Sequence, residues 1–253
     1  MTRLARAISS SGYYHIIFRG VNHCHLFEEQ ADFARLYDLL TALKSELSFK
    51  VHAYCLLNNH CHILIQEEST ASIGQIMKQL LSPYASWFNR KYGRSGALIA
   101  NRYKSECVED DKYMLALVRY IHQNPLEAGI VKRIEDYRWS SYREYLDKRQ
   151  ALTDTGFVLE YFSPKPSIAL EEFKAFHSEY KNSGYAFSEG MKKSEEDVRK
   201  EIMAMLGGME PNAICGLPKQ ERNAILVSLR KRGLTIRQIE RATGISKSVV
   251  AKA

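Results

Sequence analysis

The chain has 253 residues, of which 45% are hydrophobic and 26% are charged. This composition is typical of a folded globular protein and excludes wholesale disorder. No apolar run approaches the roughly 20 residues that a membrane-spanning helix needs, and we expect no signal peptide. The five cysteines form no Cys-x-x-Cys pair. We therefore expect a cytoplasmic protein with no disulfide framework, no zinc knuckle and no membrane partner.

The charge is unevenly distributed. The chain has 36 Lys and Arg against 29 Asp and Glu, a net charge of +7. Residues 219–253 hold nine basic and two acidic side chains, whereas residues 151–218 hold seven and eleven. A concentrated positive charge suits a polyanion such as nucleic acid. Charge alone leaves open the alternative of a solvated basic helix face.

The first half of the chain alternates strand and helix patterns. Aromatic and β-branched residues predict strands, and apolar residues spaced three and four apart predict helices. The predicted elements, in chain order, are a strand at 13–20, a helix at 32–47, two strands at 51–66 around Asn58-Asn59, a helix at 72–92, a strand at 102–108 and a helix at 110–123 that ends before Pro125. This order predicts an α+β fold, a ferredoxin-like antiparallel sheet with helices on one face.

Composition changes after Leu146, where acidic and loop-forming residues become common. We therefore expect three parts: a domain at 1–147, a connector with short helices at 148–218, and an all-α unit at 219–253.

The segment His60-Cys61-His62 lies in one predicted strand. Residues i and i+2 of a strand point to the same face, so both imidazoles would stand side by side. Two neutral imidazoles can hold a divalent metal ion. The pattern alone is weak, because paired histidines are as often packing or surface residues.

A second candidate segment is Tyr120-Ile121-His122-Gln123-Asn124-Pro125. Tyr120 and Asn124 are four residues apart, so they share one helix face. Tyr120 offers a phenol nucleophile and Asn124 a neutral oxygen ligand. The alternatives are a core tyrosine and a helix C-cap.

Together these segments resemble the HUH single-tyrosine transposases, in particular their REP-associated bacterial branch. The resemblance covers about residues 10–147 and is carried by these stretches: YYHIIFRGVN (13–22), VHAYCLLNNHCHILIQ (51–66), GRSGALIANRYKS (93–105), LVRYIHQNPLEAGIV (117–131) and YRWSSYREYL (137–146). Two positions depart from the family pattern, with Asn58 in place of Pro and Asn101 in place of Gly. Neither departure removes a chemical group that the reaction needs.

The resemblance implies a metal-dependent transposase that cleaves and joins single-stranded DNA. His60, His62 and Asn124 would bind Mg²⁺ or Mn²⁺. Tyr120 would form a 5′-phosphotyrosine intermediate and release a 3′-OH. It also implies recognition of DNA hairpins by a monomer or a homodimer.

Other residues are candidates of lower rank. Arg102 and Lys104 would contact phosphate, with solvated charge as the alternative. His23 and His25 form a second His-x-His in a predicted loop, where the alternation of a strand does not apply. We interpret His15 as a packing residue.

The C-terminal unit resembles the winged or sigma-type helix-turn-helix units of bacterial DNA-binding proteins. Helical patterns flank Gly244, and a helix begins near Ser246. The residues that would contact duplex DNA are Arg237, Ser246, Lys247 and Ser248. A helical bundle that binds no DNA is the alternative.

Two other functions remain open from sequence alone. A non-catalytic DNA-binding regulator would need no complete His60, His62, Asn124 and Tyr120 set. A metal-dependent hydrolase without a tyrosyl intermediate would stay active after Tyr120→Phe.

Overall fold

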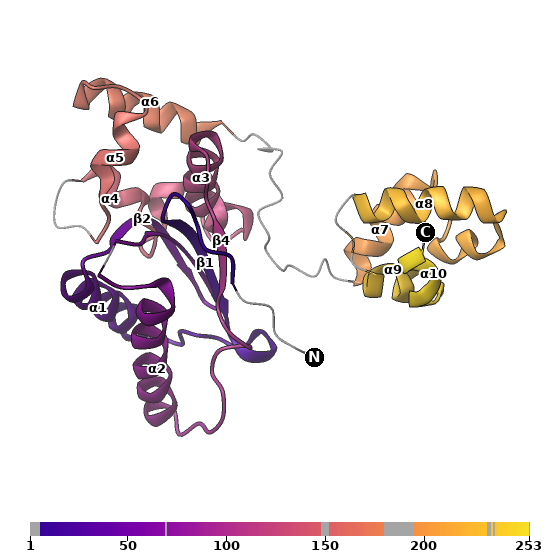
Figure 1. Cartoon of the computed structure of the whole chain (residues 1–253), viewed down its shortest axis with the longest axis horizontal. Helices are drawn as coiled ribbons and strands as arrows, with labels where there is room; N and C mark the ends of the chain where they lie inside the picture. The colour runs from indigo at the N-terminus through magenta and orange to yellow at the C-terminus, as the bar shows by residue number, and fades with distance from the viewer. Residues whose placement is uncertain are drawn as a thin grey trace. The chain divides into compact units, whose positions relative to one another are not determined.

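The structure is a computed structural model that describes residues 6–68, 70–147, 152–179, 195–231, 234 and 236–252. The chain forms two compact units, residues 1–185 and 186–253, which Figure 1 draws in indigo to pink and in orange to yellow. The cysteines are free thiols, and no helix within the described ranges is long and apolar enough to span a membrane.

Four antiparallel strands form the sheet of the first unit. They are β1 (Tyr13–Arg19), β2 (Lys50–Leu57), β3 (His60–Gln66) and β4 (Lys104–Cys107). Their order is β2-β3-β1-β4, so β1 and β3 are central and buried along most of their length. This order is that of a ferredoxin-like sheet, and the predicted α+β class is confirmed.

Two long helices cover one face of this sheet. They are α1 (Gln30–Leu47) and α2 (Ile73–Lys91), which pack against each other (Figure 1). On this side the ring of Tyr37 in α1 meets Tyr54 of β2, with centroids 5.9 Å apart. The register pairs Tyr54 with Ile63, so Ile63 points to the same apolar layer.

Further helices cover the opposite face, which the prediction of helices on one face did not include. They are α3 (Asp111–Glu127), α5 (Thr155–Glu160) and α6 (Pro166–Ser178), joined by the short elements η2 (Ile134–Asp136) and α4 (Tyr142–Leu146). The reason is that α3 has its own apolar stripe, with Leu117 and Ile121 fully buried. A second apolar layer therefore forms on this side of the sheet.

The helix α3 runs two residues past Pro125 rather than ending before it. Proline has no N–H, so the intrahelical hydrogen bond that position 125 would donate to the Ile121 carbonyl is missing. The carbonyls of Asn124 and Pro125 accept bonds from Ala128 N and Ile130 N, both at 2.9 Å. These bonds close the turn around the proline.

The predicted connector at 148–218 does not form one part in the structure. Its first half packs on the sheet unit, where the ring of Phe157 stacks on Tyr13 at 5.5 Å. Its second half contains α7 (Glu195–Met205) and η3 (Pro211–Gly216), which pack against α9 (Ile236–Thr243) of the other unit. Apolar side chains in both halves, such as Phe173 and Ile202, are fully buried, which explains the division.

The C-terminal unit is all-α, as expected. It adds α8 (Lys219–Lys231) and α10 (Lys247–Lys252) to α7, η3 and α9. Its core contains Ile202, Leu226, Leu229 and Ile239, all fully buried. Gly244, with φ of 77°, makes the turn between α9 and α10, a backbone conformation that favours glycine.

Candidate active site

The two histidines of β3 lie on the sheet face that α3 covers. Their ring centroids are 5.1 Å apart and the rings are nearly perpendicular. His62 is fully buried and His60 half-buried. In the register with β1, His60 lies opposite Arg19 and His62 opposite Ile17. The side-by-side placement that strand alternation predicts is present.

Helix α3 brings Tyr120 against this pair. The Tyr120 ring meets His62 edge-on, with centroids 5.5 Å apart and an interplanar angle of 89°. Asn124 is buried one turn further along the helix, and its Nδ2 donates to the Tyr120 carbonyl at 2.8 Å. Residues 58 positions apart in the sequence, His62 and Tyr120, are thereby in ring contact.

The turn before β3 orients His60. Asn59 Oδ1 lies 2.7 Å from His60 Nδ1, and an amide oxygen only accepts, so His60 Nδ1 carries the proton. The turn is anchored by Gly20 N donating to the Asn59 carbonyl at 2.9 Å and Leu26 N donating to the Asn58 carbonyl at 2.6 Å. Asn58, which departs from the family pattern, thus still supports this turn.

Two residues beside the site, His15 and Glu106, were not among the site residues predicted from the sequence. His15, interpreted as a packing residue, has its Nε2 atom 3.0 Å from His62 Nδ1. On its other side, His15 Nδ1 lies 3.6 Å from Glu106 Oε2. The sequence did contain a signal for His15. Alternation along the strand places residues 13, 15, 17 and 19 on one face of β1, so His15 shares its face with Arg19.

Arg102 and Lys104 border an open hollow of about 640 Å³ along β4. Both side chains are exposed. The hollow is lined by Arg6, Asn101, Arg102, Tyr103, Lys104, Ser105 and Glu106. The Arg6 guanidinium lies 3.7 Å from the centre of the Tyr103 ring. Glu106 lines this basic hollow and also lies beside His15.

His122 has a structural position. Its Nδ1 lies 2.9 Å from His177 Nε2 and its Nε2 lies 2.7 Å from Ser141 Oγ. Burial, with His177 beside it, holds the pKa of His122 well below its usual range. This network fastens α6 and Ser141 to the helix that carries Tyr120.

His23 and His25 lie where the chain leaves β1. His23 ends the short η1 helix (Val21–His23) with a φ of 60°, and His25 is exposed beside Glu28. This backbone is not a strand, so their side chains do not alternate as those of His60 and His62 do.

The residues present fit a divalent metal ion in their donor chemistry. Within the described ranges, no group of three or more His, Cys, Asp or Glu could hold a metal. A site here would therefore need a different third ligand, and Asn124 supplies an amide oxygen. Imidazole nitrogens bind first-row transition-metal ions, an amide oxygen suits Mn²⁺ or Mg²⁺, and no thiolate of the kind that soft metals prefer is part of this set. Cys61 points to the opposite face and is fully buried.

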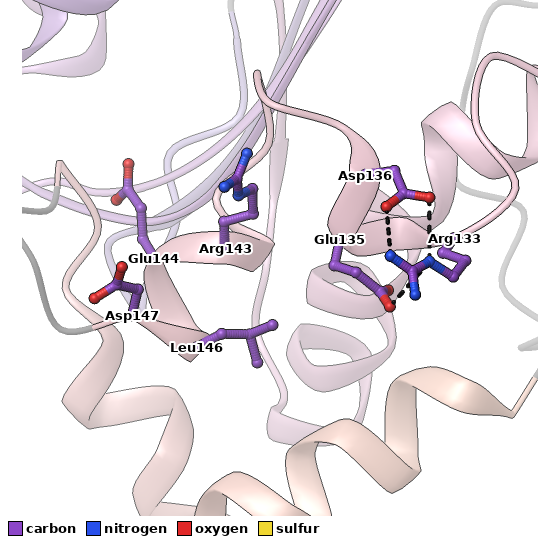
Figure 2. Close-up of a pocket in the computed structure, with 7 residues that line it drawn as sticks. All are labelled: Arg133, Glu135, Asp136, Arg143, Glu144, Leu146 and Asp147. Atoms are coloured by element: carbon purple, nitrogen blue, oxygen red, sulfur yellow. Dashed lines mark hydrogen bonds and ion pairs between the residues drawn. The ribbon is translucent and has the colours of Figure 1, made fainter.

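A second hollow lies between η2 and α4, apart from the histidine face. Figure 2 shows that its charged residues include a paired group, Arg133 with Asp136 and Glu135. These exposed ion pairs neutralise one another, so we assign this hollow no chemistry.

The predicted contacts of the C-terminal unit lie at the turn and the start of α10. Ser246, Lys247 and Ser248 are exposed, and Lys247 Nζ lies 3.7 Å from Glu240 Oε2. Arg237 belongs to α9, but its side chain is outside the described residues.

Comparison with known proteins gives consistent matches for the first unit. The family model described as IS200-like transposase matches residues 8–124. A protein named as a REP-associated tyrosine transposase, from Haemophilus influenzae, is 29% identical over 105 residues. That match covers 37% of this chain and 59% of the relative, less than two thirds of its length.

Two solved structures are more distant. One, a REP-associated tyrosine transposase bound to a REP hairpin, is 18% identical with a TM-score of 0.48, and the match covers 62% of this chain and 92% of the other. The second, a transposase from Deinococcus radiodurans R1, is 19% identical with a TM-score of 0.34, over 48% and 97%. Residues 8–124, which carry the β3 histidines and Tyr120, are thus similar to the family of IS200-like transposases.

Proposed function

We propose that the first unit cleaves single-stranded DNA at a hairpin and joins the ends again through a 5′-phosphotyrosine on Tyr120. One observation carries this proposal: the Tyr120 ring lies against His62, beside His60, on one face of the sheet. A nucleophile next to a pair of metal-ligating side chains is the arrangement that covalent phosphoryl transfer needs. The hairpin substrate rests on the family resemblance.

In this mechanism His60, His62 and Asn124 would hold Mg²⁺ or Mn²⁺, and the bound ion would supply Lewis-acid polarisation of the scissile phosphate. Asn59 holds the His60 side chain with the proton on His60 Nδ1. The lone pair of the ring is then on His60 Nε2, the nitrogen that would coordinate the metal ion. The edge contact with His62 limits the directions that the Tyr120 ring can take.

Tyr120 Oη forms a bond to phosphorus as the bond from phosphorus to the 3′ oxygen breaks. The phenol loses its proton, and the 3′ oxygen gains one to become a free hydroxyl. An ordinary phenol has a pKa of about 10, so the positive charge near the phosphate must favour its ionised form. Attack by a 3′-OH on the phosphotyrosine reverses the step, so joining needs no external energy source.

The DNA backbone would follow the hollow along β4. Arg102 and Lys104 are exposed there, and fixed positive charges with an aromatic neighbour suit single-stranded DNA. Arg19 lies opposite His60 in the register and its carbonyl accepts from Ala100 N, so it adds a cation near the start of this hollow.

We expect the double variant Arg102→Gln/Lys104→Gln to weaken hairpin binding. If each side chain contacts one phosphate, the negative slope of log affinity against log salt becomes shallower by about 1.4 for single-stranded DNA. Fluorescence anisotropy between low and high salt measures this slope. The matched control is Lys165→Gln/Lys174→Gln, which removes two exposed cations, one at the N-cap of α6 and one within it. Equal slopes in both variants would exclude β4 as the phosphate track.

The C-terminal unit is proposed to bind duplex DNA through the start of α10. A glycine turn between two helices, followed by exposed Ser246, Lys247 and Ser248, matches the contacts of a helix-turn-helix. Separate titrations of the full chain with a labelled hairpin and a labelled duplex, repeated with Lys247→Glu, test this division. Loss of duplex binding alone supports it.

The proposed chemistry is tested by trapping the intermediate. We expect a 3′-labelled single-stranded hairpin to migrate with the protein on a denaturing gel when Mg²⁺ or Mn²⁺ is present, but not with EDTA. A 5′-labelled copy is expected to give a free fragment whose 3′-OH a polymerase extends. Cleavage without an adduct would indicate a hydrolase, and binding without cleavage under any divalent metal would indicate a non-catalytic regulator.

A further inference from the structure

His15 and Glu106 form a chain of polar contacts that ends on His62. His15 Nε2 lies 3.0 Å from His62 Nδ1, and the two rings stack with centroids 5.2 Å apart. His15 Nδ1 lies 3.6 Å from Glu106 Oε2. His15 is fully buried and the Glu106 side chain is 24% exposed.

The sheet register creates this alignment. His15 lies directly opposite Glu106 of β4 in one ladder and opposite Leu64 of β3 in the other. Because His62 is two residues before Leu64, it is the diagonal neighbour of His15 on the same face. All three side chains are therefore fixed by strands rather than by loops.

The contacts also favour one distribution of protons over the ring nitrogens. The Glu106 carboxylate, 3.6 Å from His15 Nδ1, is beyond hydrogen-bond distance, but its negative charge favours a proton on that nitrogen. The Nε2 atom of His15 is then an acceptor, and His62 Nδ1 must be the donor at 3.0 Å. In that arrangement the lone pair of the His62 ring is on Nε2, the nitrogen that would coordinate a metal ion.

We propose that His15 and Glu106 are positioning residues that hold the His62 imidazole in the orientation and tautomer of a metal ligand. The proposal rests on the proposed function, in which His62 binds the metal ion. It parallels the contact of Asn59 Oδ1 with His60 Nδ1, so each β3 histidine has its own partner at Nδ1. Such outer partners raise metal affinity by restricting the ligand.

The first test reads the tautomer in the metal-free full chain. Long-range ¹H–¹⁵N NMR, with His62 assigned from a His62→Gln variant, is expected to show the proton on Nδ1. His15→Phe keeps an aromatic ring but removes the acceptor, and we expect His62 to lose this preference. The control is His52→Phe, because His52 is equally buried but bonds to Gln66 and the Asp154 carbonyl.

The second test measures Mn²⁺ binding by electron paramagnetic resonance. We expect His15→Phe to weaken affinity by about 10- to 100-fold, and His15→Gln, which retains an acceptor, to restore part of it. If His15→Phe does not fold, Glu106→Leu on the edge strand β4 is expected to shift both readouts in the same direction. A His62 proton on Nε2 in the wild type, or affinities equal to that of His52→Phe, would overturn the proposal. Absence of a Tyr120 adduct would refute the proposed chemistry without changing the tautomer result.

Discussion

Tyr120→Phe is expected to abolish the covalent adduct and to reduce strand cleavage by at least about 1000-fold, the scale on which loss of a nucleophile acts. The substitution removes only the phenol oxygen. The edge contacts of the ring with His62 and with His15, at centroid distances of 5.5 and 6.3 Å, remain available to phenylalanine. The loss can then be ascribed to chemistry rather than to folding. The gel assay with a 3′-labelled hairpin measures both adduct and cleavage.

Tyr113→Phe is the matched control. Tyr113 lies two helical turns before Tyr120 in α3, so it is on nearly the same face but further from His62. We expect this variant to form adduct at close to the wild-type rate and to bind the hairpin equally well. An adduct that persists in Tyr120→Phe and disappears in Tyr113→Phe would move the nucleophile to the earlier position.

Local sequence patterns predicted the parts of the site that lie within one element. Strand alternation placed His60 and His62 on one face, and helical spacing placed Tyr120 and Asn124 on one side of α3. That these two segments meet was inferred only from the family resemblance. Spacing within an element does not specify which strands are neighbours.

His15 shows this limit most clearly. Its contact with His62 exists because β1 is inserted between β3 and β4 in the sheet. Sequence order places β3 next to β2, and nothing in the Tyr13–Arg19 segment states which residue of β3 it will oppose. An isolated histidine in a strand was therefore interpreted as packing, although its ring bonds directly to a candidate ligand.

The domain boundary was misplaced for a related reason. The acidic composition after Leu146 resembles a linker, but Phe173 and His177 of α6 are buried. Composition averages over the face that packs and the face that is solvated. A short amphipathic helix with a polar exterior is therefore easily taken for a connector.

The burial of His177 predicts that the first unit loses stability in acid. His177 Nδ1 lies 2.8 Å from the Phe173 carbonyl, which can only accept, so Nε2 is left as the acceptor for His122 Nδ1 at 2.9 Å. Every polar atom of the ring is thus used in its neutral form. Burial lowers the pKa of His177 from 6.5 to about 3. A proton on His177 Nε2 would remove the lone pair that accepts the hydrogen bond from His122 Nδ1.

The direction of the effect follows from proton binding in the two states. Above about pH 6.5 the ring is neutral both folded and unfolded, so its contribution is constant. Below that pH the unfolded chain binds a proton that the folded chain excludes, and the free energy of unfolding falls until about pH 3. At pH 5 the expected loss from His177 is about 2 kcal/mol.

Urea unfolding at pH 7.5 and pH 5.0, followed by tryptophan fluorescence, measures this loss of stability in the first unit. Both tryptophans, Trp87 and Trp139, belong to residues 1–185. We expect His177→Gln to be less stable than wild type at pH 7.5, by about 1–3 kcal/mol for the broken network. Its further decrease at pH 5.0 should be smaller than the wild-type decrease by about 2 kcal/mol.

The control for general titration is His25→Gln, which removes an exposed histidine from a loop. This variant should keep the full wild-type decrease, because it leaves the buried contact of His122 with His177 intact. If His177→Gln loses as much stability between the two pH values as wild type, the buried pair is not the origin of acid sensitivity. A smaller decrease confined to His177→Gln would show that the clamp between α3 and α6 opens by protonation. The support of the helix that carries Tyr120 would then weaken with falling pH.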